Sequence, residues 1–261
     1  MRKQVHPTAI VAKGARIAPG VQIGPYCVVS EKASIGRNTR LHSHVTIDGK
    51  TTIGASCEVF PYTAIGCPPQ DIKYKGEDTE VIIGDRNIIR ECVTIHRGSL
   101  GGDGKTEIGD DNFLMAYCHV AHDVKIADRV IMANSVQFAG HCEVQSNVVF
   151  GGVVAVHQYC RIGTYAMVAG FSGVGKDVPP FMISSGGERA KLYGPNLVGL
   201  KRAGFSDEKI GMIKKAFRII FQSKLSLREA VEETKNQIKD SPEVDTLIAF
   251  IEQKSKRGII R

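Results

Sequence analysis

Aliphatic side chains recur at every sixth position over most of the chain, and this repeat restricts the possible fold more than any other feature. The first series is unbroken and consists of Val11, Ile17, Ile23, Val29, Ile35, Leu41, Ile47, Ile53, Val59 and Ile65. After Ile83, Ile89 and Ile95 the phase changes, and a second series follows from Ile108 to Val174. A period of six fits neither the 3.6-residue turn of an α-helix nor a long alternating strand. Each hexad is therefore predicted to form a short strand and a tight turn.

A second slot, four residues after each aliphatic position, holds small side chains. Five of the seven cysteines fall in this slot, namely Cys27, Cys57, Cys118, Cys142 and Cys160. Free cysteine behaves as a small buried hydrophobe. The odd number of cysteines and the lack of a C-x-x-C pair argue against a disulfide framework or a zinc knuckle. We expect these five cysteines to be core residues.

Turn-forming residues follow the aliphatic slot, as in the segments "IGRNTR" and "IGDDNF". Three hexads make one triangular coil of 18 residues, and stacked coils place equivalent residues about 4.8 Å apart, as in a sheet. This pattern resembles the hexapeptide-repeat acyltransferases over residues 5 to about 178. The resemblance implies a left-handed parallel β-helix, and the left-handed sense comes from it alone, because the usual crossover rule favours the right-handed form.

Two segments interrupt the repeat and are expected to be loops, at residues 66–80 and 99–107. Loops that leave a rigid solenoid are where such proteins usually place their binding sites. We therefore predict a mainly β domain over residues 1–190, with these two loops carrying part of a site.

The hexads end before a segment with helical spacing, and residues 191–261 are predicted to form a small α-helical domain. Ser206, Ser226 and Ser241 each precede a run of helix-forming residues as candidate N-caps. Glu229 completes a capping box with Ser226, and Pro242 suits the first helical position.

Charge and hydropathy narrow the class of protein. The net charge of +7 suits a polyanionic partner, such as an acidic carrier protein or a phosphorylated substrate. No basic block alternates with aromatic residues, so a nucleic acid partner is not expected. No apolar run approaches the roughly 18 to 20 residues of a membrane span, and no signal-peptide core is present. A cytoplasmic protein without a transmembrane segment is expected.

The segment "CHVAHD" contains His119, His122 and Asp123 within an otherwise apolar alternation. His141 follows His122 by 19 residues, one more than a coil, and His157 follows His141 by 16. Four of the eight histidines thus fall on a few successive rungs, which suggests a cleft. The residues alone leave three possibilities open: solvated turn residues, a zinc site, or a catalytic base with an orienting carboxylate.

A narrower resemblance runs from residue 5 to the C-terminus. The motifs that carry it are "VTIHRG", "HVAHDVKI", "FAGHCEV", "GGVVAVHQYCRIG", "DVPPF", "NLVGLKRAGF" and "RGIIR". In this order they resemble the UDP-N-acetylglucosamine acyltransferases that begin lipid A synthesis in Gram-negative bacteria. The resemblance implies transfer of an (R)-3-hydroxyacyl group from acyl carrier protein to the 3-position of UDP-N-acetylglucosamine. It also implies a homotrimer and no cofactor or metal, since the donor is carried on the phosphopantetheine of the carrier protein.

The resemblance assigns roles to individual residues. His122 matches the general base, Asp123 the residue that orients it, and the N–H of Gly140 the donor to the developing oxyanion. Substrate-binding roles fall on Gln70, Asp71, Lys73, His119, His141, His157, Gln158, Gly170, Asn196 and Arg202. Gly170 matches the position that limits the acyl groove, so a longer hydroxyacyl chain is expected. The plain alternatives are an exposed loop lysine for Lys73, a turn glycine for Gly170 and a cap for Asn196.

Other functions predict other features. The related N-acyltransferase carries an additional N-terminal domain, for which repeats that begin by residue 5 leave no room. A variant that acylates a 3-amino sugar would have nearly the same sequence. A structural or ice-binding solenoid predicts regular faces without clustered histidines, and a metal-dependent lyase predicts bound zinc. Val198 stands where many relatives have an acidic residue, and residues 187–195 include one more residue than is usual.

Overall fold

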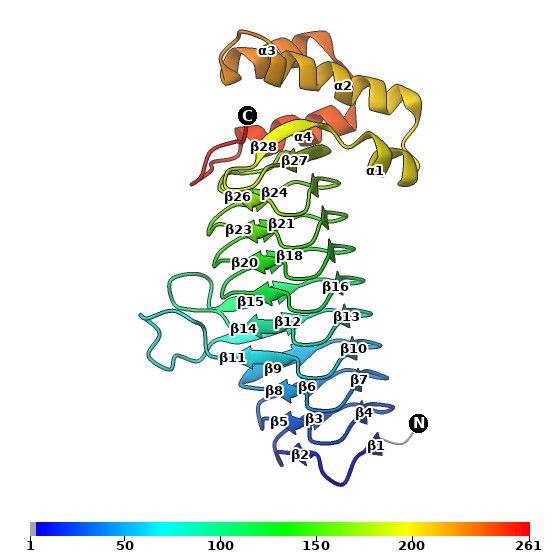
Figure 1. Cartoon of the computed structure of the whole chain (residues 1–261), viewed down its shortest axis with the longest axis vertical. Helices are drawn as coiled ribbons and strands as arrows, with labels where there is room; N and C mark the ends of the chain where they lie inside the picture. Colours follow the sequence, from blue (N-terminus) through cyan, green and yellow to red (C-terminus); the bar gives the residue numbers. More distant parts are fainter. Residues whose placement is uncertain (1–3) are drawn as a thin grey trace.

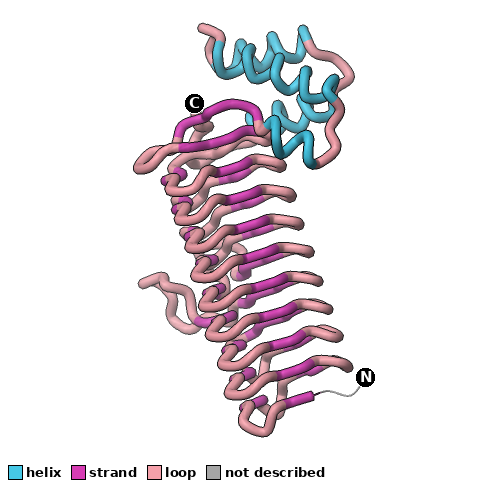
Figure 2. The backbone as a smooth tube through the Cα atoms, turned by 45° about the vertical axis from the view of Figure 1, so that its right-hand side comes forward, coloured by secondary structure: helices cyan, strands magenta, loops and turns pink. Residues whose placement is uncertain are grey.

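Each predicted hexad folds as a short strand followed by a tight turn, and the turns wind the chain into a three-sided prism. The computed structural model describes residues 4–261, so the first three residues of the predicted domain 1–190 lie outside it. The fold is a left-handed parallel β-helix with a helical cap at its C-terminal end (Figure 1). A tube view shows the rungs stacked along one axis (Figure 2). The predicted fold class is confirmed.

The three faces are called sheets A, B and C, and every neighbouring pair is parallel except the last pair of sheet A. Sheet A has eleven strands: β1 (Gln4–Val5), β4 (Gln22–Ile23), β7 (Arg40–Leu41), β10 (Glu58–Val59), β13 (Ile88–Ile89), β16 (Phe113–Leu114), β19 (Ile131–Met132), β22 (Val149–Phe150), β25 (Met167–Val168), β27 (Met182–Ser185) and β28 (Lys191–Pro195).

Sheet B has nine strands: β2 (Ile10–Val11), β5 (Val28–Val29), β8 (Thr46–Ile47), β11 (Ala64–Cys67), β14 (Thr94–His96), β17 (His119–Val120), β20 (Gln137–Phe138), β23 (Ala155–Val156) and β26 (Gly173–Val174). Sheet C has eight strands: β3 (Arg16–Ile17), β6 (Ser34–Ile35), β9 (Lys50–Ile53), β12 (Glu80–Ile83), β15 (Lys105–Ile108), β18 (Lys125–Ile126), β21 (Glu143–Val144) and β24 (Arg161–Ile162).

The aliphatic slots form the interior of the prism. Register pairs such as Ile126 with Val144 are one coil apart, so equivalent side chains stack along the axis. From Ile23 to Val174 the residues of this series are at most 3% exposed, whereas Val11 and Ile17 at the open end are only partly buried. The stacked column buries apolar surface on every rung, which stabilises the solenoid cooperatively between neighbours.

The five cysteines of the small-residue slot are buried, as the repeat predicts, while Cys67 and Cys92 are half-buried. Burial raises the pKa of the Cys118 thiol to about 11 and that of the Cys160 thiol to about 12. Desolvation disfavours a thiolate, so these cysteines act as neutral packing residues.

Most of the tight turns place one residue in the left-handed region of backbone conformation. Asp123, His141 and Tyr159 have φ values of 59°, 60° and 66° and follow one another at intervals of one coil. A left-handed conformation costs a non-glycine residue roughly 1 kcal/mol or more, which the regular packing of the rungs must offset. The turn geometry thus points side chains from successive rungs out of the same corner.

Both loops leave the prism at the corner where sheet B leads into sheet C, which we call the site corner. The first loop, 68–79, joins β11 to β12, and the second, 97–104, joins β14 to β15. The predicted bounds 66–80 and 99–107 need correction. Strand pairing extends into both ends of the first segment and into the end of the second, and β14 already ends at His96. β15 already begins at Lys105, which pairs with Glu80 of β12, so the second loop begins and ends earlier than predicted.

The C-terminal region closes the top of the prism. The helical domain predicted from residue 191 begins at α1 (Leu197–Arg202), because residues 191–195 form β28, antiparallel to β27. The other helices are α2 (Asp207–Gln222), α3 (Leu227–Gln237) and α4 (Pro242–Glu252).

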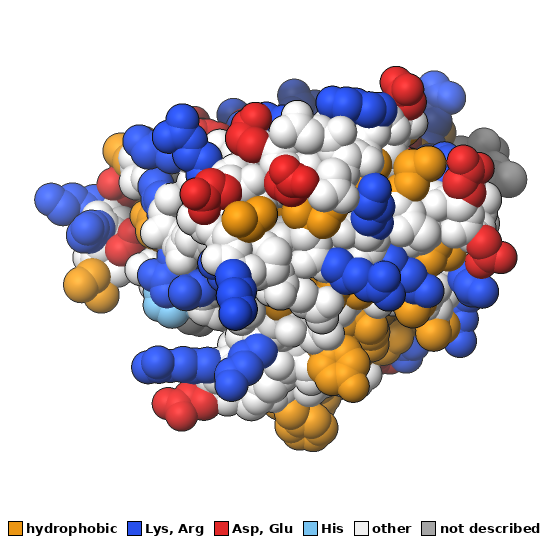
Figure 3. Space-filling model, turned by 90° about the horizontal axis from the view of Figure 1, so that it is seen from above, with side chains coloured by type: hydrophobic (Ala, Val, Ile, Leu, Met, Phe, Trp, Pro, Cys, Tyr) orange, Lys and Arg blue, Asp and Glu red, His pale blue; other side chains and the backbone are white. Residues whose placement is uncertain are grey.

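The three predicted N-caps are present. Ser206, Ser226 and Ser241 each accept a hydrogen bond from the main chain of the first helical turn, and Ser226 forms the predicted capping box with Glu229. Many lysine and arginine side chains lie on the end of the molecule that the cap forms (Figure 3). Within residues 4–261, no helix combines the length and the apolar character needed to cross a membrane.

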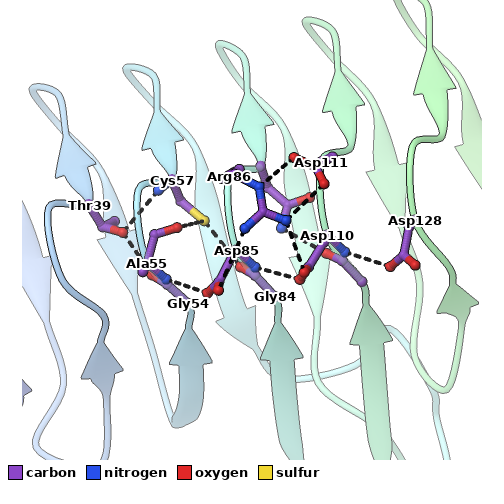
Figure 4. A network of polar contacts seen from close by, with 12 residues as sticks. Thr39, Gly54, Ala55, Cys57, Gly84, Asp85, Arg86, Asp110, Asp111 and Asp128 are labelled. Atoms are coloured by element: carbon purple, nitrogen blue, oxygen red, sulfur yellow. Dashed lines mark hydrogen bonds and ion pairs between the residues drawn. The ribbon is translucent and has the colours of Figure 1, made fainter.

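An aspartate ladder shows what the "IGD" turns contribute at the corner between sheets C and A (Figure 4). The Ala55 N–H donates to Oδ1 of Asp85 at 2.6 Å, and the Asp85 N–H donates to Oδ1 of Asp110 at 2.8 Å. The next step repeats this bond, from the Asp110 N–H to Oδ1 of Asp128 at 2.8 Å. A Cβ on Gly54 would lie 2.3 Å from the Asp85 carboxylate, so only glycine allows this close approach.

Candidate active site

Residues one coil apart form two adjacent columns at the site corner. His122, Gly140 and Gln158 form one column, and the left-handed residues Asp123, His141 and Tyr159 form the other. Main-chain hydrogen bonds join the rungs here, from the His141 N–H to the His122 carbonyl and from the Tyr159 N–H to the Gly140 carbonyl, both at 3.1 Å. His141 therefore lies one rung above His122 and one residue along, as the spacing of 19 predicts.

His122 and Asp123 form a hydrogen-bonded pair. Nδ1 of His122 lies 2.8 Å from Oδ2 of Asp123, and the side chains are 15% and 3% exposed. The Asp123 carboxylate also accepts bonds from the main chain and hydroxyl of Ser99. Burial raises the pKa of the Asp123 carboxyl, but hydrogen bonds from His122 and Ser99 and the charge of His141 outweigh burial and hold it below its ordinary value. An ionised carboxylate thus faces the imidazole.

This arrangement selects the histidine tautomer. A carboxylate only accepts hydrogen bonds, so it favours a proton on Nδ1 of His122 and leaves Nε2 as the basic nitrogen. The His122 ring packs against Gly140, where an added Cβ would lie 2.6 Å from Cε1 of the ring. Within the described part of the chain, the Gly140 N–H finds no hydrogen-bond acceptor. The corner therefore combines a basic nitrogen with a free main-chain donor.

A cavity of about 470 Å³ opens in front of this pair, between the two loops and the site corner. Six residues that the resemblance selected are among those that line it, namely Gln70, Asp71, Lys73, His122, His141 and Gln158. Loop 68–79 therefore faces the histidines across the cavity. The solenoid supplies the rigid wall, and the loops supply the opposite one.

His141 is held beside the pair by an aromatic stack. Its ring lies parallel to that of Tyr159, with the centroids 4.5 Å apart and the planes inclined by 5°. Its Nδ1 is 3.8 Å from Oδ2 of Asp123. Burial lowers the pKa of His141, with Asp123 opposing this effect and His122 and Lys256 adding to it. His141 is therefore suited to a neutral, hydrogen-bonding role.

Two of the four histidines expected in one cleft lie outside it. His119 projects from β17 on sheet B, where its Nδ1 lies 2.7 Å from Oγ1 of Thr94 and its ring meets His96 edge-on. Burial, together with His96 and His122, lowers the pKa of His119 to about 4. His157 is exposed, with Nδ1 3.2 Å from the carbonyl oxygen of Gln158. The cavity therefore takes one histidine from each of two rungs.

Three further residues selected by the resemblance lie at other corners of the same chain. Gly170 is in the turn between β25 and β26, where sheet A leads into sheet B. Asn196 caps α1 by accepting from the Gly199 N–H, and its amide donates to the carbonyl of Tyr165, in the turn from sheet C to sheet A. Arg202 is exposed at the end of α1. Figure 1 shows α1 and the two loops on opposite sides of the prism.

The sequence analysis did not select Ser99 or Tyr159, although the period of the repeat could have indicated Tyr159. Tyr159 is one coil beyond His141, so the period alone places it above that ring. The same count places Gly170 eight hexads beyond His122. Because one coil is three hexads, eight hexads do not make a whole number of coils, and Gly170 must lie at a different corner. Ser99 carries no such signal, because it lies in a segment where the repeat is interrupted.

His122, Asp123 and His141 are the one group of three possible metal ligands found among residues 4–261. Their ligand atoms lie within 4.8 Å of one another. The Asp123 oxygens already accept bonds from Ser99 and face His122. Ser99, His122 and Asp123 therefore form a hydrogen-bonded cluster, and the ring of His141 lies beside it.

Comparisons with known proteins agree with this geometry. The model of the family described as Udp N-acetylglucosamine O-acyltransferase, domain 2, matches residues 177–260, and the bacterial transferase hexapeptide model matches residues 14–49 and 105–140. The acyl-[acyl-carrier-protein]–UDP-N-acetylglucosamine O-acyltransferase of Thermodesulfovibrio yellowstonii is 57% identical over 258 residues, 99% of each chain. That of Myxococcus xanthus is 47% identical over 99% of each chain.

Two solved structures show how far the likeness extends. The UDP-N-acetylglucosamine O-acyltransferase of Moraxella catarrhalis is 43% identical and superposes with a TM-score of 0.96, over 98% of this chain and 99% of that one. The UDP-N-acetylglucosamine acyltransferase of Arabidopsis is 35% identical with a TM-score of 0.87, over 98% and 100% of the two chains. The chain is therefore an acyltransferase and belongs to the family of UDP-N-acetylglucosamine O-acyltransferases.

Proposed function

We propose that the protein transfers an (R)-3-hydroxyacyl group from acyl carrier protein to the 3-hydroxyl of UDP-N-acetylglucosamine, the first step of lipid A biosynthesis. The observation that carries this proposal is the His122–Asp123 pair, 2.8 Å apart, which faces a cavity of about 470 Å³ beside the free N–H of Gly140. The names of the relatives, which give the acyl carrier protein donor and the UDP-sugar acceptor, support it.

The geometry supplies each part of an acyl transfer. Nε2 of His122 takes the proton of the sugar hydroxyl as its oxygen attacks the thioester carbonyl. The Gly140 N–H donates to the oxyanion of the tetrahedral intermediate. As that intermediate collapses, the C–S bond breaks, the C–O bond remains, and the imidazolium returns the proton to the thiolate. Asp123 holds the tautomer and stabilises the imidazolium.

Loop 68–79 is proposed to bind the sugar nucleotide. Lys73 is exposed and lines the cavity, so its ammonium group is free to meet a diphosphate. Gln70 and Asp71 line the same wall and offer hydrogen-bonding groups suited to sugar hydroxyls. The exposed side chain of Ile72, between Asp71 and Lys73 in the sequence, gives the cavity an apolar rim.

The proposal includes a homotrimer, and the outward face of sheet A is the observation that favours it. Its outward positions on five successive rungs are apolar, and their register pairs form one ladder: Ile88, Phe113, Ile131, Val149 and Met167. Of the five matching positions of sheet C, the first is Ile82 and the other four are charged: Glu107, Lys125, Glu143 and Arg161. An apolar ladder on one face is suited to contact with another subunit. Such packing would let a neighbour contribute Gly170, Asn196 or Arg202 to the site corner.

An arginine in the sheet A ladder is expected to weaken the assembly. Ile131 is 39% exposed in one chain, and Ile131→Arg would place a charge in the proposed contact. We expect the mass measured by light scattering at micromolar concentration to fall from that of a trimer to that of a monomer. Ile10→Arg is the control, because Ile10 is 67% exposed on sheet B, outside the ladder. A variant at Ile131 that remains trimeric would place the subunit contact elsewhere.

The charge of the C-terminal cap suits an acidic carrier protein. Residues 196–261 contain 14 lysines and arginines against nine carboxylates, and Figure 3 shows basic side chains distributed over this end. Charge of this kind accelerates encounter with an acidic partner more than it increases affinity.

The direct test is an acyl-transfer assay with UDP-N-acetylglucosamine and 3-hydroxyacyl carrier proteins of graded chain length. We expect ester formation at the 3-position without added metal or cofactor, and faster turnover of the hydroxyl sugar than of its 3-amino analogue. Because Gly170 has no side chain, longer hydroxyacyl groups should be preferred. A lack of ester product would refute the proposed reaction, and a preference for the shortest chain would refute the role of Gly170.

A further inference from the structure

Ser99 lies on loop 97–104 and is 2% exposed, pressed against the carboxylate of Asp123. Its N–H is 3.1 Å from both Oδ1 and Oδ2 of Asp123, and its hydroxyl donates to Oδ2 at 2.7 Å. Oδ2 is also the oxygen that faces Nδ1 of His122 at 2.8 Å. The Ser99 hydroxyl and the imidazole therefore share one carboxylate oxygen.

The same loop packs closely against the carboxylate through Gly102. An added Cβ at Gly102 would lie 2.5 Å from Cγ and 2.6 Å from Oδ1 of Asp123. The Gly102 N–H donates to the Ser99 carbonyl at 3.2 Å and closes the turn. From below, the Asp123 N–H donates to Oγ1 of the buried Thr106 at 3.0 Å. The carboxylate is thus held in one orientation from several sides.

Loop 97–104 is in turn fixed to the loop that lines the far side of the cavity. Nε of Arg97 donates to the hydroxyl of Tyr74 at 3.0 Å, and Nη1 donates to the Gly66 carbonyl at 2.9 Å. The guanidinium also lies 5.6 Å from the centre of the Tyr74 ring. These bonds fix the start of the loop that carries Ser99.

We propose that Ser99 is a positioning residue for the transfer reaction, which fixes the Asp123 carboxylate so that Oδ2 stays aligned with Nδ1 of His122. The proposal rests on the function proposed for His122. In this role Ser99 acts on the Asp123 carboxylate and not on the sugar hydroxyl or the thioester, and no proton leaves it during the reaction. Its hydroxyl restricts rotation of the carboxylate and takes a share of the negative charge on Oδ2.

Ser99→Ala is expected to lower kcat about 10- to 100-fold, the range that corresponds to loss of one charge-assisted hydrogen bond. The KM for UDP-N-acetylglucosamine should stay within about twofold, because Ser99 holds the base and not the sugar. Ser99→Thr keeps the hydroxyl and should recover most of the lost kcat. Gly102→Ala should lower kcat as Ser99→Ala does, because its methyl group displaces the carboxylate.

Matched controls separate this effect from general damage. Ser30→Ala removes a hydroxyl that donates to the Gly49 carbonyl at 2.8 Å, in a turn of the same corner near the N-terminal end. Gly187→Ala adds a methyl group where no heavy atom lies within 4 Å of the new Cβ. Both controls should keep the wild-type kcat.

A second measurement does not require the proposed substrates. Diethyl pyrocarbonate modifies neutral imidazole, so the rate of His122 modification against pH, followed by peptide mass spectrometry, gives a titration midpoint. Ser99→Ala alters none of the titratable groups around His122. These are Asp123, His96, His119 and His141, together with the cavity residues Asp71, Lys73, Tyr74, Glu77 and Tyr159. Without the hydroxyl, Oδ2 interacts more strongly with the imidazolium, so the midpoint measured for Ser99→Ala should lie above that measured for wild type.

The two readouts distinguish the possible failures. A lower kcat together with a higher midpoint supports the positioning role. An unchanged kcat, an unchanged midpoint, or a loss confined to KM would each overturn it. If the wild-type protein forms no ester, the proposed function fails, and the midpoint still decides whether Ser99 controls the charge around His122.

Discussion

His122→Ala is expected to lower kcat by about three to four orders of magnitude, close to the upper end of what general base catalysis contributes. The variant loses the imidazole that is proposed to take the proton of the sugar hydroxyl, while the Gly140 N–H and the cavity remain. The fold should persist, because His122 lies outside the aliphatic column and its ring packs on Gly140 at the surface of the prism. Steady-state kinetics and thermal melting, measured on the same preparation, check both expectations.

The pH dependence of the wild-type activity is a second test of His122 as the base. A base must be neutral to accept a proton, so activity should fall as acid protonates the imidazole that acts as the base. The pKa of Asp123 is held below its ordinary value, so this carboxylate stays ionised while the imidazole titrates. His6→Ala is the control for the substitution of His122, since His6 is exposed and directly follows the first strand, β1, several rungs from the site. Residual turnover above about a tenth of wild type would remove His122 as the base.

Asp177→Ala is expected to destabilise the protein by about 3 to 5 kcal/mol, the usual cost of leaving a buried charge unpaired. Asp177 is fully buried, and its Oδ2 lies 2.8 Å from Nε and 2.7 Å from Nη2 of Arg161, whose side chain is 8% exposed. Its Oδ1 accepts from the Arg161 N–H at 2.9 Å. No other carboxylate within residues 4–261 forms an ion pair with this guanidinium.

The same pair joins the last rungs to the C-terminal cap. Nη1 of Arg161 donates to the side chain of Gln253 at 2.7 Å, and its guanidinium lies 4.5 Å from the centre of the Phe250 ring. The Asp177 N–H and carbonyl bond to Gly258 and Ile260 of the terminal segment at 2.9 and 3.0 Å. A solenoid is stabilised by contacts between neighbouring elements. In the Asp177→Ala variant we therefore expect the amide hydrogens of the cap to exchange earlier than those of the rungs below it.

Calorimetry and hydrogen exchange would measure this loss. Asp78→Ala is the matched control, because the Lys32–Asp78 pair is 57% and 71% exposed and its loss should leave the melting temperature close to that of wild type. Asp177→Ala and Asp78→Ala with equal melting temperatures would mean that the buried pair does not hold the cap.

The repeat predicted the solenoid well because its information is local. The aliphatic residue of each hexad can be buried only if three hexads close one coil, so the core, the burial of Cys118 and the register follow from spacing. The helix starts at Ser206 and Ser226 follow from capping, which is equally local. The loop bounds were less accurate, since the end of a loop depends on where pairing with a neighbouring rung resumes.

The candidate site was predicted in part. Counting by coils places His141 near His122, and the structure confirms that arrangement. The pattern did not reveal that His119 faces sheet B beside His96, because a neighbouring position in a hexad can point toward a different face. Gly170 and Asn196 lie at other corners of the chain, so one copy of the sequence does not assemble all the residues that the resemblance selected.

The sequence by itself determined the prism, its buried column and the corner on which His122 stands, because each of these depends on a period that is repeated many times. Only the tertiary structure decided how the Asp123 carboxylate is held. Ser99 reaches it from 24 residues away through a loop that obeys no repeat. The path of such a loop is set by contacts such as that of Arg97 with Tyr74, which form only when distant segments meet in the folded chain.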